Sequence, residues 1–379
     1  MRWVVNWLHL IMMPARAAEP VYRPILAGQR GELDALGHLD GAHAPMIAPI
    51  LQLSVMDRSI VEALGRLPPG LVPALDVSAV PDAAAAEPAR WGVPLMPVIC
   101  LADGERRLAA HGATARAHTG RAVVRLRVGQ DRAGPDATTA ATERIWRYAR
   151  LAPEQCDLLV DCGDVGCPAD VRVVEPRVRR MLDWARRHAW RSVSVAAGGM
   201  PAALSRLPTD EPVRLGRWDW LLWQELADLG VGFGDYGVAS ATAVPAVAGD
   251  RLPTVRYTTD DAWWIYRWSR RGGRGDGRVA DLCRTVVSTS HWPSAGAAFS
   301  WGDHEILRRA RRGAGAGSTT NWLAWSTSHH LAHVLAALGQ PAHDGAWHPV
   351  VAGQRGHYDD ATPPPRGRTP RGGSARRAG

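Results

Sequence analysis

The strongest constraint on the fold is a regular alternation of short apolar runs with amphipathic segments between residues 22 and 239. Eight runs have the length and composition of β-strands: 22–27, 46–54, 71–78, 93–102, 121–129, 156–165, 191–198 and 231–239. Helix-like segments follow the first seven of these runs, at 30–39, 59–67, 81–91, 105–118, 137–151, 175–188 and 216–230. Near-continuous apolar runs such as "VPLMPVICLA" are typical of parallel strands covered by helices. Eight such units predict an α/β protein with a (β/α)8, TIM-barrel-like fold.

An open, doubly wound sheet is the alternative arrangement of the same units. That fold commonly carries a Gly-rich turn between a strand and a helix for a dinucleotide, and no run here ends in one. The segment "GAGAGS" at 313–318 follows no predicted strand, so it is typical of a loop rather than a phosphate-binding turn. The barrel is therefore the preferred prediction.

After residue 239 the alternation stops, which indicates a different kind of structure within the same domain. The segment 254–272 predicts a strand or hairpin followed by the start of an aromatic helix, and helices are expected at 278–289, 304–313 and 321–339. "TTDD" is a helix-capping signal, and Asp303 is expected to cap the helix that follows it. We expect one domain at 21–340 that includes a C-terminal helical and hairpin cap at 240–340.

The two ends of the chain differ from this domain. Residues 1–20 contain an apolar run shorter than the ~20 residues of a membrane span, and we interpret them as an extension from a misplaced start or as a weak signal-like segment. Residues 341–379 become rich in Arg, Pro and Gly, which predicts a disordered tail. A cytoplasmic protein without membrane association is expected.

Charge and cysteine usage narrow the functional classes. The net charge is +8 and the pI about 9.8, and every cationic side chain is Arg because the chain contains no Lys. A basic balance can indicate nucleic-acid binding, but part of it lies in the tail, so a nucleic-acid partner is disfavoured without being excluded. The five Cys lack the paired spacing of a zinc site and are expected to be reduced thiols.

An ordered set of landmarks is similar to a known family. The segments are "YRPILAGQRGELDAL", "IAPILQL", "VRLRVG", "LLVDCGDV", "GFGDYG", "VRYTTDDAWW", "AFSWGDHEI" and "TNWLAWSTSHHLAHV". Over residues 21–338 this order resembles the beta protein family, named from a T-even bacteriophage protein and widespread in bacteria. The resemblance implies a barrel-like fold with an ordered cap, and the family has no settled activity.

Two positions depart from the family pattern. The family usually carries Lys in the loop after the first strand, where this chain has Ala27, Gly28, Gln29 and Arg30. It also tends to have Glu at the end of the second strand, where this chain has Gln52. If those residues are catalytic in the family, the resemblance does not carry the same chemistry to this chain.

Alternation along a strand decides which side chains face the barrel interior. In "VVRLRV" the apolar side chains share one face, which belongs against the helices, so Arg125 and Arg127 are expected to point inward. The same parity directs Asp161 inward from the run "LLVDCGD". Gln52, Asp76 and Asp235 occupy comparable late positions in their own runs.

These polar strand ends predict a pocket at the carboxyl ends of the strands, where barrel enzymes place their sites. Carboxylates suit acid–base catalysis or Mg²⁺ binding, and the candidate catalytic residues are Asp161, Asp164 and Asp235. Arginines suit phosphate or carboxylate. The candidate ligand-binding residues are Arg30, Glu32, Gln52, Arg125, Arg127, Tyr236, Arg256 and Tyr257. A buried arginine–aspartate layer that only stabilises the barrel is the alternative.

The corner after the first run allows a sharper prediction. Glu32 falls in the first turn of a helix, where its charge complements the helix dipole, whereas a cation such as Arg30 is electrostatically misplaced there. We therefore expect the Arg30 guanidinium to lie over the same opening as Arg127, Asp161 and Asp235, within about 15 Å.

Three functions remain open on the sequence. The first is a barrel protein that takes a phosphorylated or nucleotide-like small molecule, with hydrolysis as its candidate reaction and Mg²⁺ as the cofactor its carboxylates suit. The second is a non-catalytic interaction protein in phage–host conflict. The third is nucleic-acid binding through an Arg-rich surface, which salt weakens steeply. The sequence leaves the substrate, the reaction and the oligomeric state open.

Overall fold

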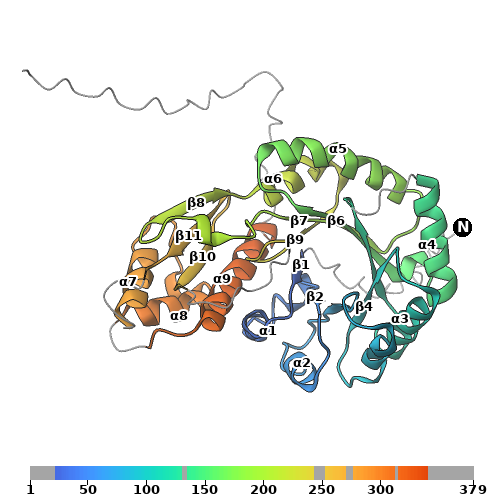
Figure 1. Cartoon of the computed structure of the whole chain (residues 1–379), viewed down its shortest axis with the longest axis horizontal. Helices are drawn as coiled ribbons and strands as arrows, with labels where there is room; N and C mark the ends of the chain where they lie inside the picture. Colours follow the sequence, from blue (N-terminus) through green and yellow to red (C-terminus); the bar gives the residue numbers. More distant parts are fainter. Residues whose placement is uncertain (1–21, 130–134, 243–251, 270–275, 312–314, 340–379) are drawn as a thin grey trace, which may run out of the picture. The chain divides into compact units, whose positions relative to one another are not determined.

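Eight parallel strands pair in a closed barrel in the order β1-β2-β3-β4-β5-β6-β7-β9, and β9 pairs back with β1 (Figure 1). Their bounds are β1 (Tyr22–Leu26), β2 (Ile50–Gln52), β3 (Ala74–Asp76), β4 (Met96–Cys100), β5 (Ala122–Arg127), β6 (Cys156–Asp164), β7 (Ser192–Gly198) and β9 (Gly232–Asp235). Each strand lies within one of the eight apolar runs. The predicted (β/α)8 TIM-barrel-like fold is therefore confirmed.

The computed structural model describes residues 22–129, 135–242, 252–269, 276–311 and 315–339. The predicted extension at 1–20 and tail at 341–379 lie outside the described residues. None of the described helices combines the length and apolarity that a bilayer-spanning segment needs.

Helices cover the outside of the barrel between successive strands. They are α1 (Arg30–Gly37), α2 (Arg58–Leu64), α3 (Glu105–Ala117), α4 (Pro135–Ala149), α5 (Pro168–Ala185) and α6 (Trp218–Glu225). The segment 81–91 differs from the prediction, because it forms two 3-10 turns instead of an α-helix, and the second of these turns contains Pro88. The 3-10 turns are η1 (Ala44–Met46), η2 (Asp82–Ala84), η3 (Glu87–Arg90), η4 (Pro153–Gln155), η5 (Leu204–Arg206), η6 (Ala227–Leu229) and η7 (Gly296–Ala298).

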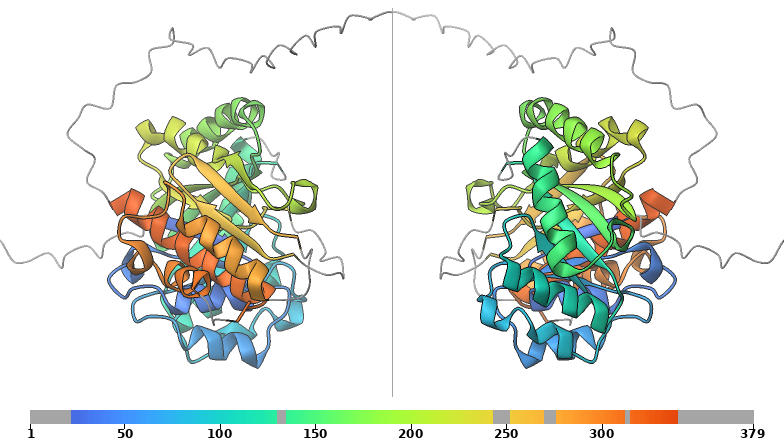
Figure 2. Two further views of the ribbon diagram at one scale, coloured as in Figure 1. Left: turned by 90° about the vertical axis from the view of Figure 1, so that its left-hand side faces the viewer. Right: turned by 90° about the vertical axis from the view of Figure 1, so that its right-hand side faces the viewer.

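A three-stranded antiparallel sheet and three helices form the cap on one side of the barrel, opposite α3 and α4 (Figure 2). The sheet has the order β10-β11-β8, with β8 (Pro212–Gly216), β10 (Thr254–Thr258) and β11 (Ala262–Arg267). The helices are α7 (Asp276–Val287), α8 (Trp301–Ala310) and α9 (Thr319–Gly339). The strand β8 comes from the segment between β7 and α6, which the sequence pattern did not predict as a strand.

Two local predictions about the cap are wrong. The aromatic segment after "TTDD" is the strand β11 rather than a helix start, since its β-favouring residues pair on both sides with β10 and β8. The cap of α8 is Ser300, whose hydroxyl accepts from the backbone N–H of Asp303 at 3.0 Å. Asp303 lies inside the first turn instead, where it is fully buried.

The barrel interior has three layers. Its middle is apolar and includes Ile25, Ile50, Val98, Val123, Leu159 and Ala196. A charged layer around Arg125 lies above this middle, toward the carboxyl ends of the strands, and a second one around Arg23 lies below it, toward the amino ends. Neighbouring residues in the strands, such as Leu26 and Val124, face the helices. The period of two thus sets which charged side chains can meet inside the barrel.

Candidate functional site

Register and alternation bring two arginines and two aspartates together at the carboxyl ends of the strands. Arg127 of β5 is paired in register with Asp161 of β6, and Arg125 lies two residues earlier on the same face. Asp76 ends β3 and shares the inward face of Ala74. Arg125, Arg127 and Asp161 point into the barrel, as expected, because only side chains on the inward faces of β5 and β6 can make the contacts described below.

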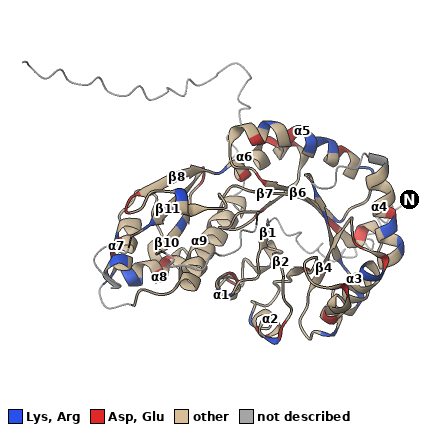
Figure 3. Ribbon diagram, in the orientation of Figure 1, with Lys and Arg blue, Asp and Glu red and all other residues tan. Residues whose placement is uncertain are grey.

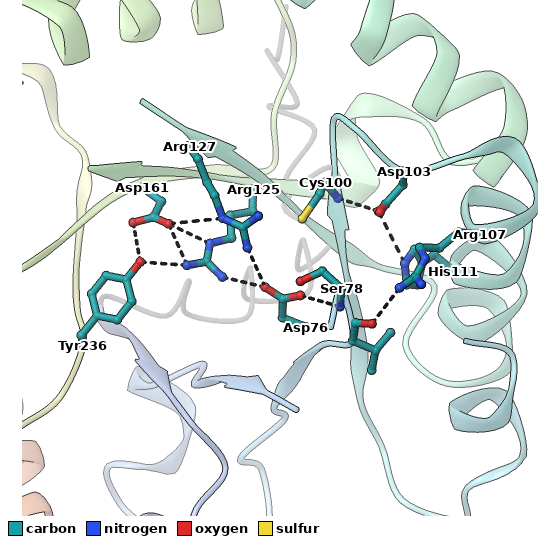
Figure 4. Close-up of polar contacts among 11 residues, drawn as sticks. Asp76, Ser78, Cys100, Asp103, Arg107, His111, Arg125, Arg127, Asp161 and Tyr236 are labelled. Atoms are coloured by element: carbon teal, nitrogen blue, oxygen red, sulfur yellow. Dashed lines mark hydrogen bonds and ion pairs between the residues drawn. The ribbon is translucent and has the colours of Figure 1, made fainter. Parts of the chain in front are cut away.

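Arg125 is the centre of this group (Figure 4). Its Nη1 donates to Asp76 Oδ2 at 2.6 Å, and its Nη2 and Nε donate to Asp161 Oδ2 at 2.7 and 3.0 Å. All three side chains are buried, with at most 4% of their surface exposed. A buried cation that bridges two carboxylates in this way holds β3, β5 and β6 together.

Tyr236 completes the layer from the residue that follows β9. Its hydroxyl accepts from Arg125 Nη2 at 2.8 Å and donates to Asp161 Oδ1 at 2.7 Å. Asp161 Oδ1 also accepts from the backbone N–H of Gly163 at 3.0 Å, and Asp76 Oδ1 accepts from that of Ser78 at 3.0 Å. Each carboxylate oxygen in the layer therefore has at least one donor.

The charges in the layer are stabilised in their ionised forms. Burial by itself raises the pKa of Asp76, but Arg125 and the two bonds from Ser78 outweigh it and hold the pKa below its usual value. Burial lowers the pKa of Arg125, but the nearby carboxylates raise it by more, so its pKa lies above the usual value. Burial and Asp161 raise the pKa of Tyr236, so its hydroxyl stays protonated. The thiol of Cys100, whose pKa burial raises to about 12, is also protonated at neutral pH.

Arg127 differs from the rest of the layer because 26% of its side chain is exposed. Its Nη2 lies 3.3 Å from Asp76 Oδ2 and its Nε lies 3.9 Å from Asp161 Oδ2, both longer than the contacts of Arg125. Gln52 at the end of β2 is also partly exposed. The saturated Arg125 layer thus forms a floor, and Arg127 lies on the solvent side of it.

Asp235 does not join this layer, which corrects the prediction for it. In β9 it shares a face with Phe233, which packs in the cluster outside the barrel, whereas Tyr236 faces the interior. Asp235 accepts from the Tyr22 hydroxyl at 2.8 Å, and its Oδ2 lies 2.8 Å from Nε2 of His330 on α9. Alternation alone could have shown that Asp235 and Tyr236 cannot share a face of one extended strand, but only the tertiary structure decides which of them faces the interior.

Asp164 is also separated from the layer, by a register shift in β6 between Asp161 and Asp164. It is exposed, and its carboxylate accepts from the backbone N–H of Ala241 at 2.8 Å and from that of Thr242 at 3.1 Å. The three candidate catalytic aspartates therefore lie in three different environments. In the described part of the chain no three or more His, Cys, Asp or Glu side chains are grouped to hold a metal ion.

The opening corner combines an exposed arginine with a buried glutamate. The Arg30 side chain is 85% exposed and pairs only loosely with Asp34, at 3.8 Å within α1. Glu32 is buried and accepts from the backbone N–H of Gln29 at 2.9 Å, as a helix-capping residue does. Burial raises the pKa of Glu32 to about 7. Asp34 is the ion-pair partner of Arg30 among the described residues, and the location of Arg30 over the mouth stays a prediction.

Arg256 and Tyr257 belong to the cap strand β10. The Tyr257 hydroxyl donates to Asp303 at 2.7 Å, and its ring stacks on His329 with the centroids 3.7 Å apart. The Arg256 backbone N–H donates to the Ser326 hydroxyl at 3.0 Å. These residues join β10 to α8 and α9, and the charge of Arg256 also acts on Glu32 of α1, whose pKa it lowers against the effect of burial.

The surface charge bears on a nucleic-acid partner. Basic and acidic segments are interspersed on the outer helices α3 and α5 (Figure 3). On α5, for example, Arg179 pairs with Glu175 and with Asp228. These pairs neutralise part of the basic charge of α5, and binding of nucleic acid through an Arg-rich surface stays a prediction.

Comparison with known proteins bears on the family and leaves the activity open. A family model described as Beta protein matches residues 22–336. No curated protein matches the chain.

The similar solved structures are distant. They are alanine racemase from Clostridium difficile 630 (12% identity, TM-score 0.30, 47% of this chain and 46% of that one), the biosynthetic arginine decarboxylase SpeA from Campylobacter jejuni (11%, 0.33, 84% and 56%) and the carboxyl transferase domain of Rhizobium etli pyruvate carboxylase (10%, 0.33, 83% and 48%). The chain spans about half the length of these proteins. Likeness at this level carries no argument about function.

Proposed function

The chain belongs to the beta protein family, and from that premise we propose that its barrel mouth binds a small anionic molecule, with Arg127 as the anchoring cation. The observation that carries the proposal is the contrast between two arginines on one strand. Arg125 is 1% exposed and bridges Asp76 and Asp161, whereas Arg127 is 26% exposed and lies on the solvent side of the same carboxylates. A guanidinium in that position can turn its N–H groups toward a phosphate or carboxylate.

The floor beneath Arg127 supports binding better than catalysis. A general base needs a carboxylate with a free lone pair near the substrate, and Asp161 already accepts from Arg125, Tyr236 and Gly163. Tyr236 has a raised pKa and keeps its proton, so it does not supply a base either. The layer is suited to fixing the position of Arg127 rather than to moving protons.

Electrostatics limits the affinity that this site can reach. Asp76 and Asp161 balance Arg125 and Arg127, so the layer has no net charge. Recognition of an anion must therefore come from directed hydrogen bonds of Arg127 instead of from a strong field. Charge-assisted hydrogen bonds of this kind each contribute about 1.5–3 kcal/mol, which corresponds to roughly tenfold or more in affinity.

The test is a thermal-shift screen of nucleotides and phosphorylated metabolites with and without Mg²⁺, followed by calorimetric titration of the best compound. Arg127→Gln should lower its affinity at least about tenfold. Arg186→Gln is the matched control, because Arg186 is exposed at the end of α5 and pairs there with Asp183. Unchanged affinity in Arg127→Gln would refute the proposal.

One observation favours a second candidate, a non-catalytic interaction protein. The side chains below Arg127 are sealed, since Arg125, Asp161 and Tyr236 are each at most 5% exposed. A mouth closed in this way suits a protein partner that rests on the rim. A screen without any small-molecule hit, together with capture of a partner that Arg127→Gln abolishes, would favour this candidate.

A further inference from the structure

The amino-terminal end of the barrel, opposite the mouth, carries a second charged group. Arg23 of β1 is fully buried beside Asp157 of β6, and its Nη2 lies 3.1 Å from Asp157 Oδ2. Arg121, directly before β5, donates to the same oxygen at 2.8 Å. Arg191, directly before β7, has its Nε 3.5 Å from Asp157 Oδ1. Three arginines therefore share one aspartate.

Ser192 is the remaining polar side chain in this group. Its hydroxyl accepts from Arg23 Nη2 at 3.1 Å and donates to Asp157 Oδ1 at 2.7 Å. Because it both accepts and donates, it adds no charge. The group as a whole has three positive charges and one negative charge, in contrast to the neutral layer at the mouth.

Several guanidinium N–H groups have no acceptor. Nε and Nη1 of Arg23, Nε of Arg121 and Nε of Arg191 are buried and make no hydrogen bond within the described residues. A buried charged donor without an acceptor costs more than an ordinary lost hydrogen bond. The pKa of Arg23 is lowered, first by burial and then by the nearby charges of Arg121 and Arg191, although Asp157 raises it. A lowered pKa is consistent with excess positive charge in the group.

We propose that this arginine group, formed by Arg23, Arg121 and Arg191 around Asp157, is a binding site for a small oxyanion such as inorganic phosphate or sulfate. Planar guanidinium groups match the oxygens of such an anion, and unused donors come from three different strand ends. Entry is through the rim, because the Arg121 and Arg191 side chains are 27% and 25% exposed whereas Arg23 and Asp157 are 0% exposed.

The site is separate from the one at the mouth. The apolar layer with Ile25, Val123 and Leu159 lies between them inside the barrel. It lies at the amino ends of the strands. Residues at this end of a barrel serve stability, whereas active sites lie at the carboxyl ends, so a bound anion here is expected to stabilise the fold. An anion that binds only the folded chain raises its stability with the logarithm of the anion concentration.

The experiment measures thermal unfolding of the full chain against phosphate and sulfate concentration, with sodium chloride added to keep the ionic strength constant. The midpoint should rise steadily with either oxyanion and stay unchanged with chloride alone. In the double variant Arg121→Gln, Arg191→Gln, which keeps the buried Arg23–Asp157 pair, the rise should disappear and the calorimetric affinity for phosphate should fall at least about tenfold.

Two controls make the result specific. Arg58→Gln removes an arginine that is 92% exposed on α2, and it should leave the phosphate response as in the wild type. Arg186→Gln, which removes an exposed arginine at the end of α5, should also leave it unchanged. The proposal is overturned if the wild type shows no oxyanion-dependent rise, or if the folded double variant shows the same rise as the wild type.

Discussion

Removing one hydroxyl group tests whether the layer at the mouth is a coupled network. Tyr236→Phe deletes the hydroxyl that bridges Arg125 and Asp161 but keeps the ring, so it creates no large cavity. Two hydrogen bonds to charged groups are lost, each worth about 1.5–3 kcal/mol. Neither partner is left without a bond, because Arg125 Nη2 still donates to Asp161 and Asp161 Oδ1 still accepts from Gly163. We therefore expect a loss of about 2–3 kcal/mol in the free energy of unfolding.

The assay is urea unfolding followed by tryptophan fluorescence, for which the chain offers 17 Trp. The urea midpoint should fall while the slope stays that of the wild type, since the buried area is unchanged. Tyr148→Phe is the control. Tyr148 lies on the surface helix α4 with its hydroxyl bonded to Glu105, and its loss should leave the midpoint near that of the wild type.

A double-mutant cycle tests whether the contributions of Tyr236 and Asp161 to stability depend on each other. Asp161→Asn alone and together with Tyr236→Phe should give a coupling energy of about 1 kcal/mol or more, because the two side chains are in contact. A loss below about 0.5 kcal/mol for Tyr236→Phe, or additive effects in the cycle, would show that the layer does not act as one network.

Two further predictions concern the rest of the fold. The pKa of Glu32 is about 7 in the folded chain, against 4.5 for an ordinary glutamate. As the pH rises from 4.5 to 7, the wild type should therefore lose about 3 kcal/mol of stability relative to Glu32→Gln, which has no proton to lose. Parallel urea titrations at several pH values measure it, and equal pH profiles would contradict the burial argument. A Cβ at Gly302 would lie 2.1 Å from the carbonyl oxygen of Trp325, so Gly302→Ala should force α8 and α9 apart and cost about 1–3 kcal/mol or more. Gly92→Ala, where the added carbon meets nothing within 4 Å, should be neutral or slightly stabilising in the same unfolding assay.

Periodicity in the sequence was sufficient to predict the barrel strands and the inward direction of two arginines at the mouth. The eight apolar runs are local signals, and each is long enough to identify a strand without knowledge of its neighbours. The alternation in β5 correctly directs Arg125 and Arg127 inward because it depends only on which face is apolar. The order of landmarks likewise identified the family whose model matches residues 22–336.

The errors arise where a residue's environment depends on distant segments. β11 has aromatic residues that suit either a strand or a helix, and pairing with β8 and β10 decides for a strand. Asp235 faces outward because β9 fits between β1 and β7 with Gly234 directed to the interior, where a side chain would meet Ala196. The start of α1 likewise depends on a distant segment, because Gly31 packs it against α9.

Local sequence therefore determined the eight barrel strands and the inward face of β5. The tertiary structure decided which charges meet. Arg125 reaches Asp76 and Tyr236, and Arg23 reaches Asp157, only because the sheet closes and brings together strand ends that are far apart in the chain. Alternation gives each side chain a direction, but closure of the barrel and strand register give it a partner, so the neutral layer at the mouth and the basic group at the opposite end could not be predicted from any single run.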